Sequence, residues 1–472
     1  MRKLPVVPDE YPCVWSVDGS NVAGDVSLHP LKRPKGHVYD LDNWVAGAPG
    51  TKVFSGPVDE RVAFLRGKLR TNHDVVLLDA TLTRWMHDRA LVTGGTALVG
   101  LGLPSGQDQP KFGSITFQVG GLTELSGASP IKETYRPASL AAPDTEFKMV
   151  WNSDVDQEWT ALNGDKITLG YTAINKMTDH YEYYVKTHPY ITVEGEYRTA
   201  GQWMQDYVYP VRQITSFATA RRQPLSWITL EGKNERNYRA QLFAADIAQE
   251  PYEAQEPKVG FFTTLLRLGA TGLSLATLID RWQRLHEEHE TFFDVFADQP
   301  HQRDTSLRSR LLLLVPALES YHSGERGDGT VTREQHRAQR KAVLEQLTQA
   351  GADSDTVKWV KEQIDDRPGY PLNKRLRELV DELSPELRDR IQTRITSLPP
   401  ELDFMGGDVD VWNVMGKVRN NLGHGGTIHT DDQLLPLVRL ADTLTIGLAL
   451  KKLNVPDTAL IRAIDCGEWA LF

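Results

Sequence analysis

Three polar residues near the C-terminus have the types and spacing that phosphodiester chemistry needs. Arg419, Asn420 and His424 lie in the segment GKVRNNLGHGGTIH (416–429). Histidine titrates near neutral pH and can accept or donate a proton, whereas arginine stays charged and presents a planar fork to phosphate oxygens. Together they could help a ribose 2′-hydroxyl attack its own phosphate, with Arg419 stabilising the developing charge and no metal ion or other cofactor required.

The same residues also have a simpler explanation. Cationic side chains are favoured at helix C-termini, where they satisfy free carbonyl groups. R-x-x-x-x-H is a short pattern that occurs by accident, so spacing alone favours this structural role over catalysis. His429 lies farther along the segment and is a weaker alternative to His424 as the proton-transfer group.

An amphipathic helix is expected to carry the pair. Five apolar residues form a stripe at helical spacing: Val411, Trp412, Met415, Val418 and Leu422. Arg419 is expected at the flank of this stripe, and the glycines that follow favour helix termination. On an ideal helix Arg419 and His424 would be about 140° apart. Either a glycine exit turns His424 round, or a second chain completes the pair.

The composition is that of a globular protein without a general attraction for nucleic acid. The chain has 472 residues, 40% hydrophobic and 25% charged, with a net charge of −10. Any polyanion must therefore meet a local basic patch. Cys13 and Cys466 are the only cysteines, which excludes a disulfide framework and a Cys-rich zinc site. No signal peptide or membrane span is evident, so we expect a cytoplasmic protein.

The two halves of the chain have different residue patterns. Residues 1 to about 235 contain short β-branched segments separated by turn residues, which predicts an antiparallel, sandwich-like domain or a partly open barrel. From about residue 275 the apolar spacing is helical. We therefore predict an α+β chain with a β-rich domain at 1–258 and an all-α bundle at 259–472.

Other candidate sites are weaker. HEEHE (286–290) places His286 and His289 three residues apart, whereas a zinc-binding H-E-x-x-H helix needs four, so we expect a solvated charged face there. GLGLPSG (100–106) misses the dinucleotide fingerprint and is predicted to be a turn. The sequence thus indicates neither a metal site nor a cofactor.

Several segments resemble one family. The Arg-Asn-x-x-x-His spacing resembles the R-N-x-x-x-H signature of HEPN domains, and ALESYHSGE (317–325) is similar to the LE-x-YH helix of the subgroup found in ApeA-type bacterial anti-phage proteins. FLRGKLRTNHDVVLLDATL (64–82) and FGSITFQVGGLTELSG (112–127) resemble the ApeA N-terminal domain. Leu125 and Val76 replace its usual aromatic residue and threonine. The resemblance covers nearly the whole chain.

This resemblance implies a HEPN ribonuclease domain behind a sensing or regulatory domain. In the family the arginine and histidine of paired protomers form one composite cleft. Arg419 would then bind the phosphate, His424 would be general base or acid, and Asn420 would orient one of them. Family members cut RNA, including tRNA, and halt growth of the infected cell. The implied partners are RNA, a second or further copies of the chain, and a phage trigger that the sequence does not identify.

Glu319 and His322 are three residues apart on the upstream helix and therefore share one face. By the same resemblance they could flank the cleft, with His322 or Tyr321 touching RNA. A helix-surface hydrogen bond unrelated to catalysis explains them equally well.

The charge of the helical half is an obstacle to RNA binding. Residues 301–472 contain 23 Lys and Arg against 26 Asp and Glu, although phosphate contacts dominate nucleic-acid affinity. Two basic clusters could form the edges of a groove. They are Arg333, Arg337, Arg340 and Lys341, and Lys374, Arg375 and Arg377.

Three hypotheses follow. The first, favoured by the intact Arg419–His424 pair, is a triggered, metal-independent endoribonuclease. The second is a HEPN-type module that only dimerises or binds RNA, with a β domain that recognises a partner. The third gives the β domain its own carbohydrate- or peptide-binding role. Six tryptophans could supply its aromatic faces: Trp15, Trp44, Trp85, Trp151, Trp159 and Trp203.

Overall fold

The structure of the chain is a computed structural model that divides into two compact units, Met1–Asp280 and Arg281–Phe472. Each unit is considered by itself. The boundary expected at 258/259 lies outside the described residues. The residues described are 6–17, 19–39, 58–86, 89–106, 108–135, 147–152, 155–177, 183–233, 237–250, 264–298, 305–326, 333–364, 370–396, 410–425 and 429–466.

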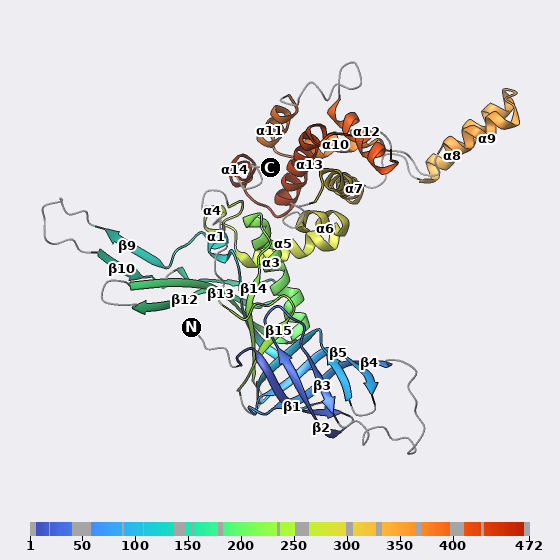
Figure 1. Cartoon of the computed structure of the whole chain (residues 1–472). Coiled ribbons are helices and arrows are strands. Elements are labelled where there is room, and N and C mark those ends of the chain that lie inside the picture. The colour runs from blue at the N-terminus through green and yellow to red at the C-terminus, as the bar shows by residue number, and fades with distance from the viewer. Residues whose placement is uncertain are drawn as a thin grey trace, which may run out of the picture. The chain divides into compact units, whose positions relative to one another are not determined.

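The first unit contains a closed six-stranded antiparallel barrel (Figure 1). The strands run in the order β5–β4–β1–β2–β3–β6, and the ring closes because β6 pairs with both β3 and β5. The predicted antiparallel β-rich fold is confirmed, and the barrel is closed rather than partly open. The strands are β1 (Asp9–Val17), β2 (Ser20–Leu28), β3 (Lys35–Tyr39), β4 (Val58–Leu69), β5 (Asp74–Met86) and β6 (Arg89–Thr93).

The same sheet continues beyond β5 as an open antiparallel extension. After β13 the chain forms α2 (Ala200–Trp203), the π-helical segment η3 (Met204–Val208) and α3 (Tyr209–Thr219), and α3 packs on β8. Two short helices, α1 (Leu122–Ser126) and α4 (Leu268–Thr271), and a separate hairpin of β9 (Ile131–Tyr135) and β10 (Phe147–Trp151) complete the described part of the unit. In spatial order the extension contains β7 (Thr96–Leu101), β15 (Asn237–Ala244), β14 (Leu225–Lys233), β8 (Lys111–Val119), β13 (Tyr183–Thr199), β12 (Lys166–Met177) and β11 (Gln157–Thr160).

Trp15 fills the centre of the barrel. Along β1, Cys13, Trp15 and Val17 point inward and the residues between them are exposed, as period-two alternation requires. The indole N–H of Trp15 donates to the carbonyl of His37 at 3.1 Å. Gly67 lies opposite Trp15 on β4, and a Cβ atom there would be 2.6 Å from the indole ring. The bulk of Trp15 therefore requires glycine at position 67.

The proposed aromatic faces are only partly available. Trp15 and Trp203 are fully buried, so they serve the core. Trp151 is 43% exposed and Trp159 is half-buried. Trp44 and the side chain of Trp85 lie outside the described residues.

The second unit is helical, as predicted (Figure 1). Its central helix, α13, packs against α7 most extensively and also contacts α6, α10, α11 and α14. The helices are α5 (Leu275–Glu288), which crosses the boundary between the units, α6 (Glu290–Asp298), α7 (Leu307–Arg326), α8 (Arg333–Gln349), α9 (Ser354–Gln363), α10 (Leu372–Asp381), α11 (Pro385–Thr396), α12 (Val411–Gly423), α13 (Asp431–Lys452) and α14 (Asp457–Cys466).

Within the described residues, α13 alone is long and apolar enough to cross a membrane. Of its most apolar 18-residue window, 72% is buried inside the unit. This burial is typical of the core helix of a bundle.

We predict that Gly67→Ala destabilises the β-rich unit by about 1–3 kcal/mol, because the added methyl group overpacks the barrel against Trp15. Gly201→Ala is the control, since a Cβ atom there meets nothing within 4 Å. Thermal unfolding of the full chain should show a lower midpoint for Gly67→Ala only. Equal midpoints for the two variants would contradict this account of the barrel core.

Candidate functional site

Arg419 is held by two neighbours while part of its guanidinium stays free. On α12, its Nη2 donates to Oε2 of Glu319 on α7 at 3.2 Å, and its Nη1 donates to Oδ1 of Asn420 at 2.9 Å. The Arg419 side chain is 35% exposed, as expected for the flank of the apolar stripe. Because a guanidinium has five N–H donors, these contacts leave donors available for a phosphate. The arrangement is suited to binding an anion.

His424 follows directly on the helix that carries Arg419. Its backbone N–H donates to the carbonyl of Asn420 at 3.0 Å, a helical i to i−4 bond. The left-handed residue is Gly425, with a φ of 69°, and therefore comes after His424. Of the two alternatives drawn from the sequence, the glycine exit between Arg419 and His424 is thus wrong. Continued ideal helical geometry would place the two side chains about 140° apart.

The His424 imidazole is exposed. Among the described residues it has no hydrogen-bond or ion-pair partner. It is therefore accessible to a bound substrate without first breaking a contact to another described residue.

Glu319 and His322 have different surroundings although they share one side of α7. Glu319 pairs with Arg419 and is 28% exposed. His322 is 1% exposed, and its Nε2 lies 2.8 Å from Oε2 of Glu378 on α10. Tyr321 is also 1% exposed. The expectation that His322 or Tyr321 touches RNA does not agree with this arrangement, because α10 and the bundle core cover both side chains.

Glu378 is a contact centre that sequence reasoning missed. It accepts hydrogen bonds from the Tyr370 hydroxyl and His322, and it pairs with Nη1 of Arg326 at 3.2 Å. The hydrogen bonds from Tyr370 and His322, with the charge of Arg326, hold the pKa of Glu378 below its ordinary value. These contacts fix α10 against α7 one turn from Glu319. Glu378 is 56 positions from His322, so no local pattern could have indicated it.

The second predicted basic cluster is engaged inside the unit. Arg375 donates to the carbonyl of Tyr370 at 3.2 Å, and Arg377 pairs with Asp410 at 2.9 Å. Asp410 is the N-cap of α12. Lys374 lies 4.7 Å from the centre of the Tyr370 ring. This cluster therefore contributes to the packing of α10 and its neighbours, although Lys374 is exposed and the Arg377 side chain is 58% exposed.

The remaining candidate histidines do not form a site. His286 is exposed, as expected for a solvated face, but His289 is 6% exposed, which corrects that expectation. His289 lies at the break between α5 and α6, and its ring packs on that of Tyr321, with the two ring centres 4.6 Å apart. His429 is 5% exposed. In the described part of the chain, no group of three or more His, Cys, Asp or Glu could hold a metal ion.

We predict that Glu378→Gln lowers the stability of the helical unit at neutral pH. The folded-state pKa of Glu378 is lowered, so its contribution is present above the unfolded value of about 4.3 and is lost as pH falls below it. Unfolding midpoints of wild type and variant, measured from pH 7 to pH 3, should converge at the acidic end. Glu287→Gln, an exposed position on α5, serves as control. A difference independent of pH would contradict the role of the charge.

Two family models match the chain. ApeA N-terminal domain 1 matches residues 39–282, more than half of the chain, and Apea-like HEPN matches residues 312–459. The second match includes Glu319, Arg419 and His424. No protein with a curated description and no solved structure matches significantly. HEPN domains are generally ribonucleases that dimerise and bind RNA. The chain belongs to the ApeA family of anti-phage proteins, with an ApeA N-terminal domain followed by a HEPN domain.

Proposed function

We propose that this protein is a metal-independent endoribonuclease whose active site uses Arg419 and His424. The supporting observation is the state of Arg419, whose guanidinium is oriented by Glu319 and Asn420 yet stays one-third exposed. An oriented cation that keeps free donors can bind a phosphate with little loss of side-chain entropy.

The proposed reaction is an internal transfer at phosphorus. The His424 imidazole takes the proton of a ribose 2′-hydroxyl, and the 2′-oxygen attacks the adjacent phosphorus as the bond to the 5′-oxygen breaks. The proton is returned to the leaving 5′-oxygen, so the products are a 2′,3′-cyclic phosphate and a 5′-hydroxyl. Arg419 stabilises the charge on the non-bridging oxygens. Both steps use protein side chains only.

The complete site requires two protomers. Ideal helical geometry separates Arg419 and His424 by about 140°, which argues against one chain placing both on the same phosphate. A two-fold axis near the end of α12 would bring Arg419 of one protomer toward the partner's His424, and the reverse. The general tendency of HEPN domains to dimerise supports this arrangement.

The biological role that follows is defence of a bacterial cell. The β-rich unit senses a phage component in the cytoplasm, and the HEPN unit then cuts RNA and arrests growth of the infected cell. tRNA is the substrate that we favour within the RNA class. Sequencing of RNA ends during infection tests this directly, because cleavage at tRNA sites should appear in wild-type cells and not in His424→Ala cells.

We predict that Arg419→Ala and His424→Ala each reduce RNA cleavage by at least about 100-fold, the loss typical when a group that stabilises the transition state is removed. Mixing the two variants should restore about one quarter of wild-type activity, since half of the dimers become heterodimers with one intact site of two. Cleavage of RNA by purified protein in the presence of a chelator is the measurement. Lys417→Ala, an exposed residue on the same helix, is the control.

Each outcome bears on a different part of the proposal. Cleavage retained by either single variant would exclude that residue from the site. If both single variants are inactive and their mixture is also inactive, Arg419 and His424 are both needed for cleavage, but they do not form one site across two protomers. Loss of wild-type cleavage with the chelator would contradict the metal-independent mechanism.

We predict that Asn420→Ala lowers kcat by about tenfold, on the scale of one hydrogen bond, because Arg419 loses the contact at Nη1 that orients it. KM should change less, since Arg419 keeps its charge. Steady-state kinetics with a short RNA would show this split. Asn421→Ala, the next position on α12, is the matched control and should resemble wild type. A rise in KM at constant kcat would show that Asn420 binds substrate instead of orienting Arg419.

A further inference from the structure

The α8–α9 hairpin is inserted between two helices of the candidate site. It follows α7, which carries Glu319, and precedes α10, which carries Glu378. Its two helices pack mainly on each other. None of the described side chains from 334 to 362 is buried, whereas α7, α10 and α13 each bury several. The hairpin therefore adds nothing to the core of the bundle.

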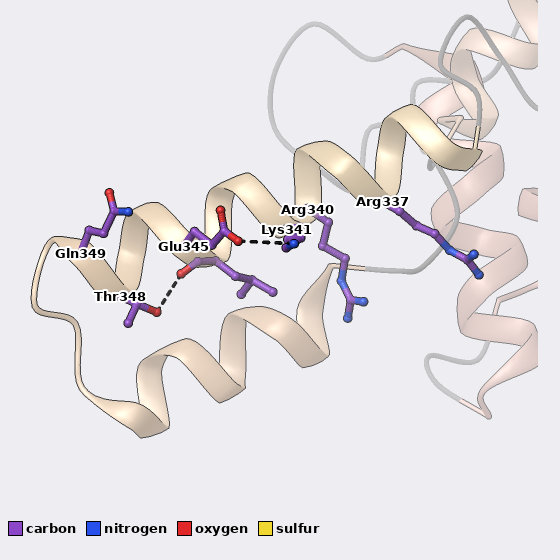
Figure 2. A pocket seen from close by; sticks show the side chains of 7 residues that line it. Arg337, Arg340, Lys341, Glu345, Thr348 and Gln349 are labelled. Atoms are coloured by element: carbon purple, nitrogen blue, oxygen red, sulfur yellow. Dashed lines mark hydrogen bonds and ion pairs between the residues drawn. The ribbon is translucent and has the colours of Figure 1, made fainter.

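One face of α8 carries a basic row. Arg337, Arg340 and Lys341 are at i, i+3 and i+4 spacing, so they share a face. Figure 2 shows these side chains along the helix with α9 beside it. The basic row lines an open hollow of about 700 Å³. The rest of the lining is Leu344, Glu345, Thr348 and Gln349.

Internal contacts leave much of this charge accessible. Arg340 donates to the carbonyl of Lys361 near the end of α9, which ties the two helices together. Lys341 lies 3.7 Å from Glu345, and their side chains are 79% and 59% exposed; such an exposed pair holds its partners weakly. Among the described residues, Arg337 has no hydrogen-bond or ion-pair partner. The basic row is thus accessible for binding an external anion.

The chain keeps the hairpin near the candidate site. Residues 327–332 connect Arg326 to Arg333 and span at most about 25 Å when fully extended. Glu319 lies about 10 Å along α7 from Arg326. The start of the basic row, Arg337, therefore lies at most about 40 Å from Glu319.

We propose that the α8–α9 hairpin is an RNA-binding arm whose basic row binds phosphates of the RNA backbone. This inference rests on the proposed ribonuclease function. The helical half has an excess of acidic residues, and each residue of its other basic cluster already has a contact within the unit, so phosphate contacts need a local source of charge. Backbone contacts position RNA without selecting sequence. The arm therefore supplies affinity, and the Arg419–His424 site supplies the chemistry.

The test compares two full-length variants with the same net charge. Arg337→Gln/Lys341→Gln removes two positive charges from the basic row. Gln339→Glu/Gln346→Glu adds two negative charges on the opposite face of α8, roughly 160–180° away, where both glutamines are exposed. Both are made in the His424→Ala protein so that bound RNA stays intact. Helix content by circular dichroism confirms that each variant is folded.

Binding is measured with labelled unfractionated tRNA and with an unrelated RNA stem-loop over a range of salt concentrations. The basic-row variant should bind both RNAs on the order of tenfold more weakly at low salt, with a salt slope reduced by about 1–2 as contacts are lost. The opposite-face variant should stay within about twofold of its parent. In the catalytically intact background, the basic-row change should raise KM while kcat at saturating RNA is kept.

Two outcomes would overturn the inference. Equal weakening by both variants would show a general effect of net charge. Unchanged RNA binding by the basic-row variant, together with altered oligomeric state for Trp359→Ala, would make the hairpin a protein-docking surface, since Trp359 is 62% exposed. Neither outcome depends on cleavage. Failure of the ribonuclease proposal would give a different result, in which the wild-type protein binds RNA and does not cut it.

Discussion

The ion pair between Glu319 and Arg419 is the contact on which the candidate site depends. Arg419 lies in the last turns of α12, and an arginine side chain there would otherwise sample many rotamers. A half-exposed ion pair contributes little to the free energy of unfolding. Its main effect is therefore on orientation, because it fixes the guanidinium relative to α7. Asn420 adds a second constraint from α12 itself.

Because Glu319 lies on α7, the orientation of Arg419 depends on how rigidly α7 is held in the bundle. That helix buries Leu311, Leu314 and Leu318 and packs on the central helix α13. One turn beyond Glu319, His322 and Glu378 join α7 to α10, and the same contacts lower the pKa of Glu378. Apolar burial thus positions α7, and a polar contact sets its rotation relative to α10. The geometry of the candidate site therefore depends on the apolar packing of α7 and on its polar contact with α10.

Local features of the site could be predicted and distant ones could not. The apolar stripe of α12 placed Arg419 at a half-exposed flank, because helical periodicity depends only on neighbouring residues. The same periodicity put Glu319 and His322 on one side of α7, but it carried no information on α10, which buries His322. Helix α12 ends at the expected glycine-rich segment, but the left-handed residue is Gly425, which follows His424 and does not separate it from Arg419. Closure of the barrel was missed because β6 pairs with β3 over a long sequence separation.

An acidic protein with the proposed function must separate packing from phosphate binding. In the bundle, Arg375 and Arg377 are engaged by carbonyl and carboxylate groups, so their charges stabilise helix contacts. On the hairpin no described side chain is buried, so charge there can change without cost to the core. Substrate affinity and active-site geometry then rest on different residues. If the hairpin binds RNA as proposed, its charges can be altered without disturbing the Glu319–Arg419 contact.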